Sequence, residues 1–159
     1  MHRCFVSNLA VLECNRLAHR LSLVPTCRGY LRCEKDAVWV LESCLRGELF
    51  HLCRGPRDGE AVISGNIFVW EPNSTGIDHW RDGVEWASQE VGGFEGGEAI
   101  DGSGLMKKTN SIRASRTVHH VVCYYTAGDK IWKRGVHVLI SFRTRDEGYL
   151  WVCFTCTDT

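Results

Sequence analysis

Apolar residues recur at spacings of three and four positions just after residue 33, as on the buried face of a helix. The residues that follow this spacing are Ala37, Val38, Leu41, Cys44 and Leu45. Glu34 and Asp36 stand where the first turn would be, and acidic side chains there interact favourably with the helix dipole. Gly47 follows the last apolar position, as is typical of a helix end. The pattern predicts a helix that begins at residue 33 or 34 and ends near residue 45.

The rest of the chain has the shorter period of strands. Residues 67–70 are β-branched or aromatic, and a Pro-Asn-Ser-Thr-Gly turn sequence follows them closely. Further β-rich runs predict strands at residues 107–112, 118–125, 136–142 and 149–154, with a hairpin turn at 144–148. With 159 residues, the chain is long enough for one domain with its own core. We therefore predict a single α+β unit with a mainly antiparallel sheet.

Composition divides the chain further. Residues 1–25 carry a loose amphipathic pattern with few acids, which fits a packed helix, a poorly ordered extension or a mitochondrial presequence. The domain itself is expected over residues 26–159. Its first half covers 26–94 and its second half covers 105–159. Residues 95–104 are rich in glycine and acids, a composition that predicts a mobile linker between them.

The segment between the first predicted strand and this linker carries the most unusual chemistry. Trp80 and Trp86 stand on either side of Asp82-Gly83. Indole rings are large and apolar, so two of them in a loop are stable only when they pack on the domain or on a partner. We predict an ordered, functional loop.

Charge neither requires nor excludes a nucleic-acid partner. The chain has 19 basic and 19 acidic residues, so it lacks the net positive charge typical of nucleic-acid binders. However, acids dominate residues 78–101 and bases dominate residues 105–134. The two blocks either pair with each other or form separate acidic and basic surfaces, and only the second arrangement attracts a polyanion.

The sequence contains no recognisable catalytic or metal-binding motif. Nine cysteines, odd in number and irregularly spaced, indicate reduced thiols. Cys153 and Cys156 have the spacing of metal ligands, but no second closely spaced pair completes a zinc site. His119 and His120 fall on a predicted strand, where adjacent side chains point to opposite faces. We expect no enzymatic activity and no metal, and a thiol- or zinc-dependent enzyme stays as a remote alternative. No apolar run reaches the length of a membrane span.

Several blocks, in order, resemble the WOPR domain of fungal transcription regulators. The first, RGYLRCEKDAVWVLESCLRGEL, resembles a strand and helix that begin that domain. The second, GNIFVWE followed by GIDHWRDGVEW, resembles its core strand and its Trp-Asp-Gly-Trp loop. GLMKKTNSI and HHVVCYYT resemble strands of its second half. Together the blocks cover about residues 28–126.

The resemblance implies a fold of two interleaved halves and a specific function. A WOPR domain would bind double-stranded, A/T-rich DNA as a monomer, in the nucleus, without a cofactor, a small-molecule substrate or a membrane. It would act in a regulator of fungal morphology and development and bind through the minor groove, where arginine is favoured. The expected DNA contacts are Arg32, Arg57, Arg81, Lys107 and Lys108. The expected scaffold of the contact loop is Trp80, Asp82, Gly83 and Trp86.

The sequence also departs from the family pattern where arginine or another base is usual. Glu90, Val84 and Ile63 occupy three such positions. Each lost charge-assisted contact to DNA costs about 1–3 kcal/mol, and glutamate adds repulsion. The rival interpretation is therefore a degenerate copy that keeps the fold, has lost DNA binding and serves as a protein-interaction module.

Overall fold

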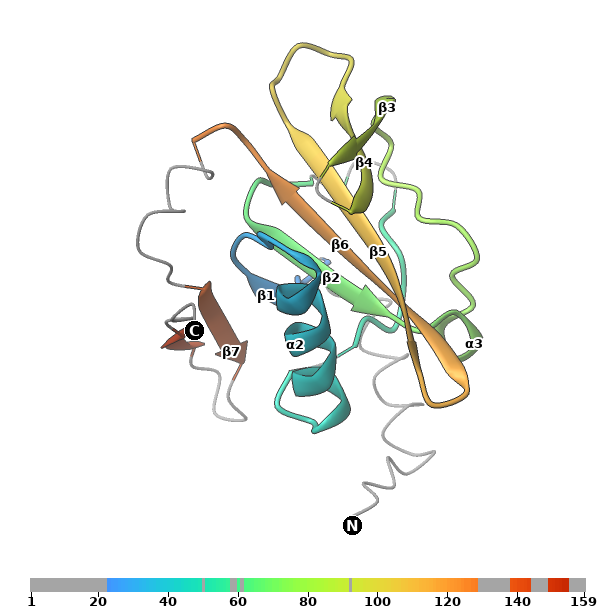
Figure 1. Cartoon of the computed structure of the whole chain (residues 1–159), viewed down its shortest axis with the longest axis vertical. Coiled ribbons are helices and arrows are strands. Elements are labelled where there is room, and N and C mark those ends of the chain that lie inside the picture. The colour runs from blue at the N-terminus through green and yellow to red at the C-terminus, as the bar shows by residue number, and fades with distance from the viewer. Residues whose placement is uncertain are drawn as a thin grey trace.

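Six strands form the central sheet of the domain. The computed structural model describes residues 23–49, 51–57, 60, 62–91, 93–128, 138–143 and 149–154. The strands lie in the order β1-β2-β6-β5-β4-β3, and each pair of neighbours is antiparallel (Figure 1). Their bounds are β1 (Cys27–Arg28), β2 (Asn66–Trp70), β3 (Trp86–Val91), β4 (Phe94–Ala99), β5 (Met106–Ala114) and β6 (Thr117–Tyr125).

Two helices and a separate hairpin complete the described chain. The helices are α2 (Glu34–Leu45) and α3 (Pro72–Thr75). Strands β7 (Val138–Arg143) and β8 (Tyr149–Phe154) pair with each other as predicted. The predictions for residues 1–22 and for the turn at 144–148 lie outside the described residues. No helix in the described ranges is long and apolar enough to cross a membrane.

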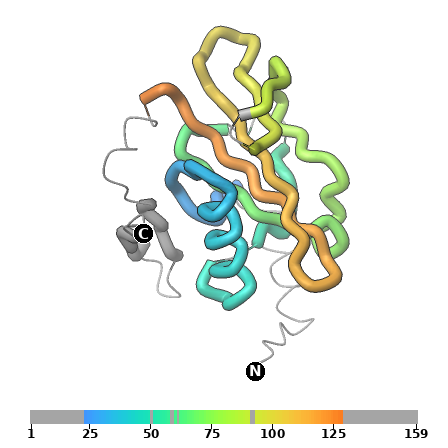
Figure 2. Tube along the Cα trace, in the orientation of Figure 1, coloured from blue at the N-terminus to red at the C-terminus, as the bar shows by residue number. Residues whose placement is uncertain are grey.

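The observed sheet confirms the predicted α+β class and its mainly antiparallel pairing. The β5–β6 hairpin of the second half lies between β2 of the first half and β4, which falls mostly in the predicted linker (Figure 2). Each half therefore depends on the other for its hydrogen-bonded neighbours. Neither half could form the fully paired sheet without the other.

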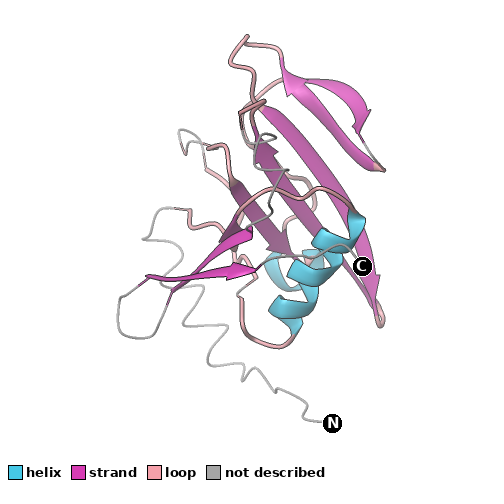
Figure 3. Ribbon diagram, turned by 60° about the vertical axis from the view of Figure 1, so that its left-hand side comes forward, coloured by secondary structure: helices cyan, strands magenta, loops and turns pink. Residues whose placement is uncertain are grey.

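Each face of the sheet has its own core. Helix α2 covers one face, which we call the helix face (Figure 3). Ala37, Val40 and Leu41 of α2 are buried there against strand residues such as Val69 and Val121. The opposite face, which we call the loop face, is covered by chain without regular structure. Its core residues are Leu52, Phe68, Trp70, Ile77, Val122 and Tyr124.

Hydrogen bonds from nearby residues stabilise the start of α2 and both ends of α3. Asp36 reaches back from the first turn of α2 to accept hydrogen bonds from the backbone N–H and the guanidinium of Arg32. Glu71 caps α3 by accepting from the N–H groups of Asn73 and Ser74. Gly76, with φ of 68°, then turns the chain so that Ile77 enters the loop-face core. The loop after α3 thus starts from an anchored residue.

The prediction of a linker at residues 95–104 is wrong for its first half. Residues 94–99 form β4, which lies inside the sheet between β3 and β5. A Cβ at Gly96 would lie 2.1 Å from the Lys107 carbonyl oxygen, and one at Gly97 would lie 2.3 Å from the Ala87 carbonyl oxygen. The glycines are therefore required by the close approach of neighbouring backbones and do not mark mobility.

Replacing Gly97 with alanine should destabilise the domain. The new methyl group would meet the Ala87 backbone and the Trp86 Cβ, 3.3 Å away, and backbone atoms cannot move aside cheaply. We expect a loss of about 1–3 kcal/mol in the free energy of unfolding, as for overpacked sites. The control is Gly128→Ala, whose methyl group meets nothing closer than the Thr126 Oγ1 at 3.6 Å. Equal stability of the two variants in urea denaturation would contradict the assignment.

Candidate nucleic-acid interface

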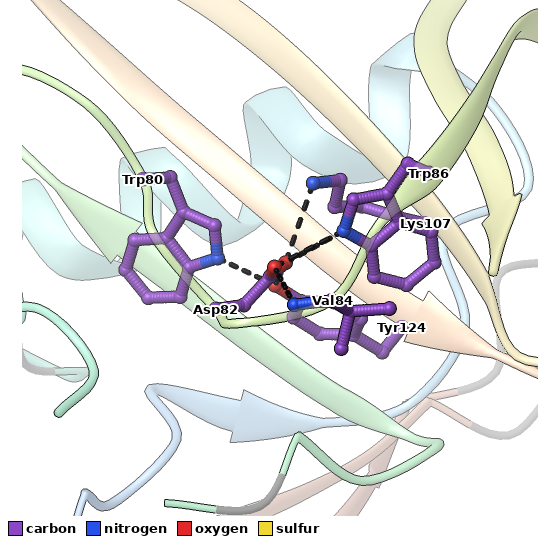
Figure 4. A network of polar contacts seen from close by, with 6 residues as sticks. All are labelled: Trp80, Asp82, Val84, Trp86, Lys107 and Tyr124. Carbon is purple, nitrogen blue, oxygen red and sulfur yellow. Dashed lines mark hydrogen bonds and ion pairs between the residues drawn. The ribbon is translucent and has the colours of Figure 1, made fainter. Parts of the chain in front are cut away.

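Asp82 fixes the loop between Trp80 and Trp86 onto the loop face of the sheet. Its carboxylate accepts hydrogen bonds from the Tyr124 hydroxyl at 2.6 Å and from the Trp86 indole N–H at 3.1 Å (Figure 4). It also accepts from the Val84 backbone N–H at 3.1 Å and lies 3.3 Å from the Lys107 ammonium. One carboxylate thus joins the loop to β3, β5 and β6.

Trp80 is held from two directions. Its ring stacks on that of Trp70, with centroids 4.5 Å apart and planes at 22°. Its indole N–H donates to the hydroxyl of Tyr124, the same hydroxyl that donates to Asp82. The ring of Phe68 packs beside it, 5.3 Å away between centroids. With the contacts of Trp86 to Asp82 and Tyr124, they show that both tryptophans pack on the domain, one of the two alternatives that the sequence leaves open, and that the loop is ordered as predicted.

The electrostatics of this cluster favour an ionised Asp82. Burial by itself would raise its pKa, but the hydrogen bonds from Tyr124 and Trp86 and the charge of Lys107 hold the pKa below its usual value. Burial and the adjacent carboxylate raise the pKa of Tyr124, which stays a hydrogen-bond donor. The Lys107 ammonium also lies 4.5 Å from the centroid of the Trp86 ring. The Asp82 carboxylate is therefore surrounded by hydrogen-bond donors and one positive charge.

Gly83 has a backbone role within this set. Its φ of 75° is in the left-handed region, which lets the chain turn back so that Val84 N–H reaches the Asp82 carboxylate. The four predicted scaffold residues, Trp80, Asp82, Gly83 and Trp86, accordingly lie together in one ordered turn.

The five predicted DNA contacts do not form one surface. Arg81 is exposed within the loop, and Arg57 is exposed in the segment around Gly55, which packs near Ile77 at the start of the same loop. Arg32 lies at the start of α2 and forms an ion pair with Asp36. Only Arg57 and Arg81 therefore combine exposure with a position on the segments that cover the loop face.

Lys107 and Lys108 are separated by the alternation of side chains along β5. Lys107 lies on the loop face with Asp82, and its side chain is 17% exposed. Lys108 lies on the helix face, is 2% exposed and donates to the Leu31 carbonyl oxygen and the Tyr30 hydroxyl. Its ammonium lies 4.5–5.1 Å from the centroids of three aromatic rings, and burial lowers its pKa. A DNA phosphate cannot reach such a group, so the predicted role of Lys108 needs correction.

Acidic residues dominate the strand next to the loop. Glu90 is exposed on β3, directly opposite the exposed Glu95 of β4. Glu85 and Glu98 are exposed on the same hairpin. By contrast, Arg113 and Arg116 are exposed at the β5–β6 turn, at the other end of the long strands. The sequence shows that this turn is positively charged, but it does not show that the turn lies far from the loop.

His51, His119 and His120 do not form a metal site with other described residues. His119 and His120 point to opposite faces of β6, as expected. His120 approaches Ser111, and His119 lies 3.3 Å from His51 between ring nitrogens. Within the described ranges, no group of three His, Cys, Asp or Glu side chains is placed to hold a metal ion. Cys156, half of the predicted metal-spaced pair, lies outside those ranges.

Comparison with known proteins identifies relatives of this chain. The model of the Gti1/Pac2 family matches residues 26–95. The chain is 43% identical to the global transcription regulator FGP1 of Gibberella zeae over 72 residues, which are 43% of this chain and 21% of that protein. It is 31% identical to the transcriptional regulator MIT1 of Saccharomyces cerevisiae over 112 residues, 68% of this chain and 17% of that protein. The chain thus spans about a fifth of the length of these curated relatives.

A solved structure has the same fold. The WOPR domain of Wor1 from Candida albicans, in complex with a 17-base-pair double-stranded DNA, superposes with a TM-score of 0.62 and 29% identity. The superposition covers 70% of this chain and 84% of that domain. The likeness therefore extends beyond the segment that the family model matches.

Replacing Asp82 with asparagine should loosen the loop. The variant keeps the size of the side chain but removes the charge that faces Lys107, and its amide N–H₂ cannot accept from Trp86 or Tyr124. We expect the free energy of unfolding in urea to fall by about 1–3 kcal/mol, the cost of buried polar groups left without partners. Asp78→Asn, in an exposed position of the same loop, should change it by less than about 0.5 kcal/mol. Similar losses in both variants would contradict the role of Asp82.

The pair of His51 and His119 should make stability fall in mild acid. Burial lowers the pKa of both, and the nearby His119 lowers that of His51 further, although Glu71 opposes this. As the pH falls through the ordinary histidine pKa, about 6.5, the unfolded chain takes up protons first and becomes favoured. The free energy of unfolding should therefore decrease between about pH 7 and pH 5. His51→Gln should reduce this decrease, whereas His79→Gln, at an exposed position, should leave it unchanged.

Proposed function

Because the chain belongs to the Gti1/Pac2 (WOPR) family through residues 26–95, we propose that it binds double-stranded DNA as part of a fungal transcription regulator. The observation that carries the proposal is the superposition on a WOPR domain in complex with DNA, over 84% of that domain. The relatives are named as transcription regulators, which supports the nuclear site of action that we propose. Control of morphology and development is the role that we propose for the whole regulator.

The loop face supports this proposal physically. Asp82 and its donors hold the loop rigid, so little conformational entropy is lost when DNA binds. Arg81 projects from the rigid loop, and Arg57 from the segment beside it. Arginine suits both phosphate contact and insertion into the narrow minor groove of A/T-rich DNA, which is the site that we propose.

The remaining predicted contacts take supporting roles in this proposal. Lys107 positions the loop through Asp82 and Trp86, and Lys108 holds the segment before α2 against the sheet. Arg32 anchors the first turn of α2. We propose that the chain binds as a monomer and that no cofactor takes part.

The acidic β3–β4 hairpin limits the affinity. Glu90 and Glu95 face each other across the hairpin beside the proposed site, and both would repel a phosphate backbone. The chain should therefore bind DNA more weakly than a copy with arginine at position 90.

Two substitutions test the proposal in fluorescence anisotropy with a short A/T-rich duplex. Arg81→Ala should weaken binding and reduce the slope of log affinity against log salt by about 1, as for one lost phosphate contact. Glu90→Arg should strengthen binding roughly tenfold, since it replaces repulsion with attraction. The matched control is Lys35→Ala, which removes one exposed positive charge from α2 on the helix face.

Two results would contradict the proposal. One is binding that does not depend on salt. The other is equal affinity for A/T-rich and G/C-rich duplexes, together with no effect of Arg81→Ala.

A further inference from the structure

Strand β3 forms an edge of the central sheet. It is the last strand in the sheet order and pairs only with β4 in the part of the chain that the structure describes (Figure 1). All six of its residues pair in continuous register, from Trp86 opposite Ala99 to Val91 opposite Phe94. A regular strand of this length presents its outer backbone groups as a template for one more strand.

The register shows which backbone groups face outward. Ile100 N–H donates to the Glu85 carbonyl oxygen at 3.0 Å, so these residues form a hydrogen-bonded pair. Because such pairs alternate along antiparallel strands, Ala87 and Gln89 direct their backbone groups toward β4. Trp86, Ser88 and Glu90 direct theirs away from the sheet. The outer edge therefore offers donors and acceptors from three alternate residues.

Several devices that often protect an edge strand are absent from β3, and its one charged side chain, Glu90, is acidic. It contains no proline and no lysine, and its pairing with β4 has no bulge. The side chains of Ala87, Ser88, Gln89 and Glu90 are all exposed. The backbone of the strand is therefore open to pairing, and Glu90 restricts the charge of the partner.

The charge around this edge selects the partner. Residues 82–106 contain no lysine, arginine or histidine. Glu90 and Glu95 lie directly opposite each other, an arrangement of like charges that destabilises a hairpin. Among the described residues, neither they nor Glu85 or Glu98 forms an ion pair. Cations beside this edge would relieve the repulsion.

We propose that the outer edge of β3 binds an extended, basic segment of another protein, which adds to the sheet as a seventh strand. Lysine or arginine side chains of that segment would lie beside Glu90 and Glu95 on one face and near Glu98 on the other. A second copy of this chain fits less well, because its β3 edge carries the same acids and residues 82–106 supply no base to oppose them. DNA is repelled by the same charges.

A synthetic peptide tests this edge in the absence of DNA. The probe is a fluorescein-labelled peptide of about eight residues that alternates lysine and valine, long enough to cover β3. We expect saturable binding in fluorescence anisotropy, and none for a matched peptide of glutamate and valine. Ser88→Pro removes the outward backbone N–H of this residue without breaking the β3–β4 pairing. It should weaken peptide binding by about tenfold or more. Ser88→Ala should bind like the unchanged protein.

A second pair of variants separates charge from backbone pairing. Glu90→Gln with Glu95→Gln should weaken peptide binding by about three- to tenfold. Glu34→Gln with Glu42→Gln makes the same change in charge on α2 and should have no effect. A peptide N-methylated at alternate residues keeps its charge but loses half of its backbone donors, so it should bind much more weakly.

Three results would overturn the proposal. The first is equal binding of the N-methylated and the unmodified peptide, which would indicate attraction by charge alone. The second is equal loss of binding in the α2 control variant. The third is a dimer in analytical ultracentrifugation that Ser88→Pro abolishes, which would assign the edge to a second copy. The N-methylated peptide keeps the test valid even if Ser88→Pro unfolds the chain.

Discussion

The ionised carboxylate of Asp82 is the interaction on which the loop face depends. It is almost fully enclosed, with 4% of its side chain exposed, and an enclosed anion is stable only when donors surround it. Those donors come from β3, β5, β6 and the loop itself, so the loop can be ordered only when the sheet is complete. The same requirement ties the first half of the chain to the second, because Lys107 and Tyr124 follow the loop in sequence. Formation of the sheet and ordering of the loop on its surface are therefore coupled.

Local pattern was sufficient to predict the elements whose side chains repeat regularly. The helix predicted to end near residue 45 is α2, and the β-branched run at residues 67–70 is most of β2. The β3–β4 hairpin was missed because glycine and glutamate have low strand propensity, and only the neighbouring backbones make them necessary. The partnership of Asp82 with Tyr124 spans 42 positions and leaves no local signal. The sequence therefore predicted that the loop is ordered, but not what orders it.

Positive charge illustrates the same limit at the level of the site. The sequence analysis predicts DNA contacts for both Lys107 and Lys108, although alternation along a strand places them on opposite faces. Nothing in the sequence shows which of these faces α2 covers. Once α2 lies on the face of Lys108, that ammonium is enclosed by Tyr30, Phe94 and Tyr125 and becomes part of the core. Counting basic residues thus overestimates the positive surface of this chain. Lys108 thus supports the interior, while the exposed charge of the β3–β4 hairpin is acidic at Glu90 and Glu95.

The stack of Trp70 on Trp80 also gives the molecule an optical property. Two indole rings with centroids 4.5 Å apart and nearly parallel planes are close enough for their electronic transitions to couple. Coupled chromophores in a fixed, chiral arrangement produce a pair of circular-dichroism bands of opposite sign at the strong indole absorption, which uncoupled indoles do not. Since Trp70 belongs to β2 and Trp80 to the loop, that signal exists only while the loop lies on the sheet. The Trp70–Trp80 signal therefore reports directly whether the loop is packed on the sheet.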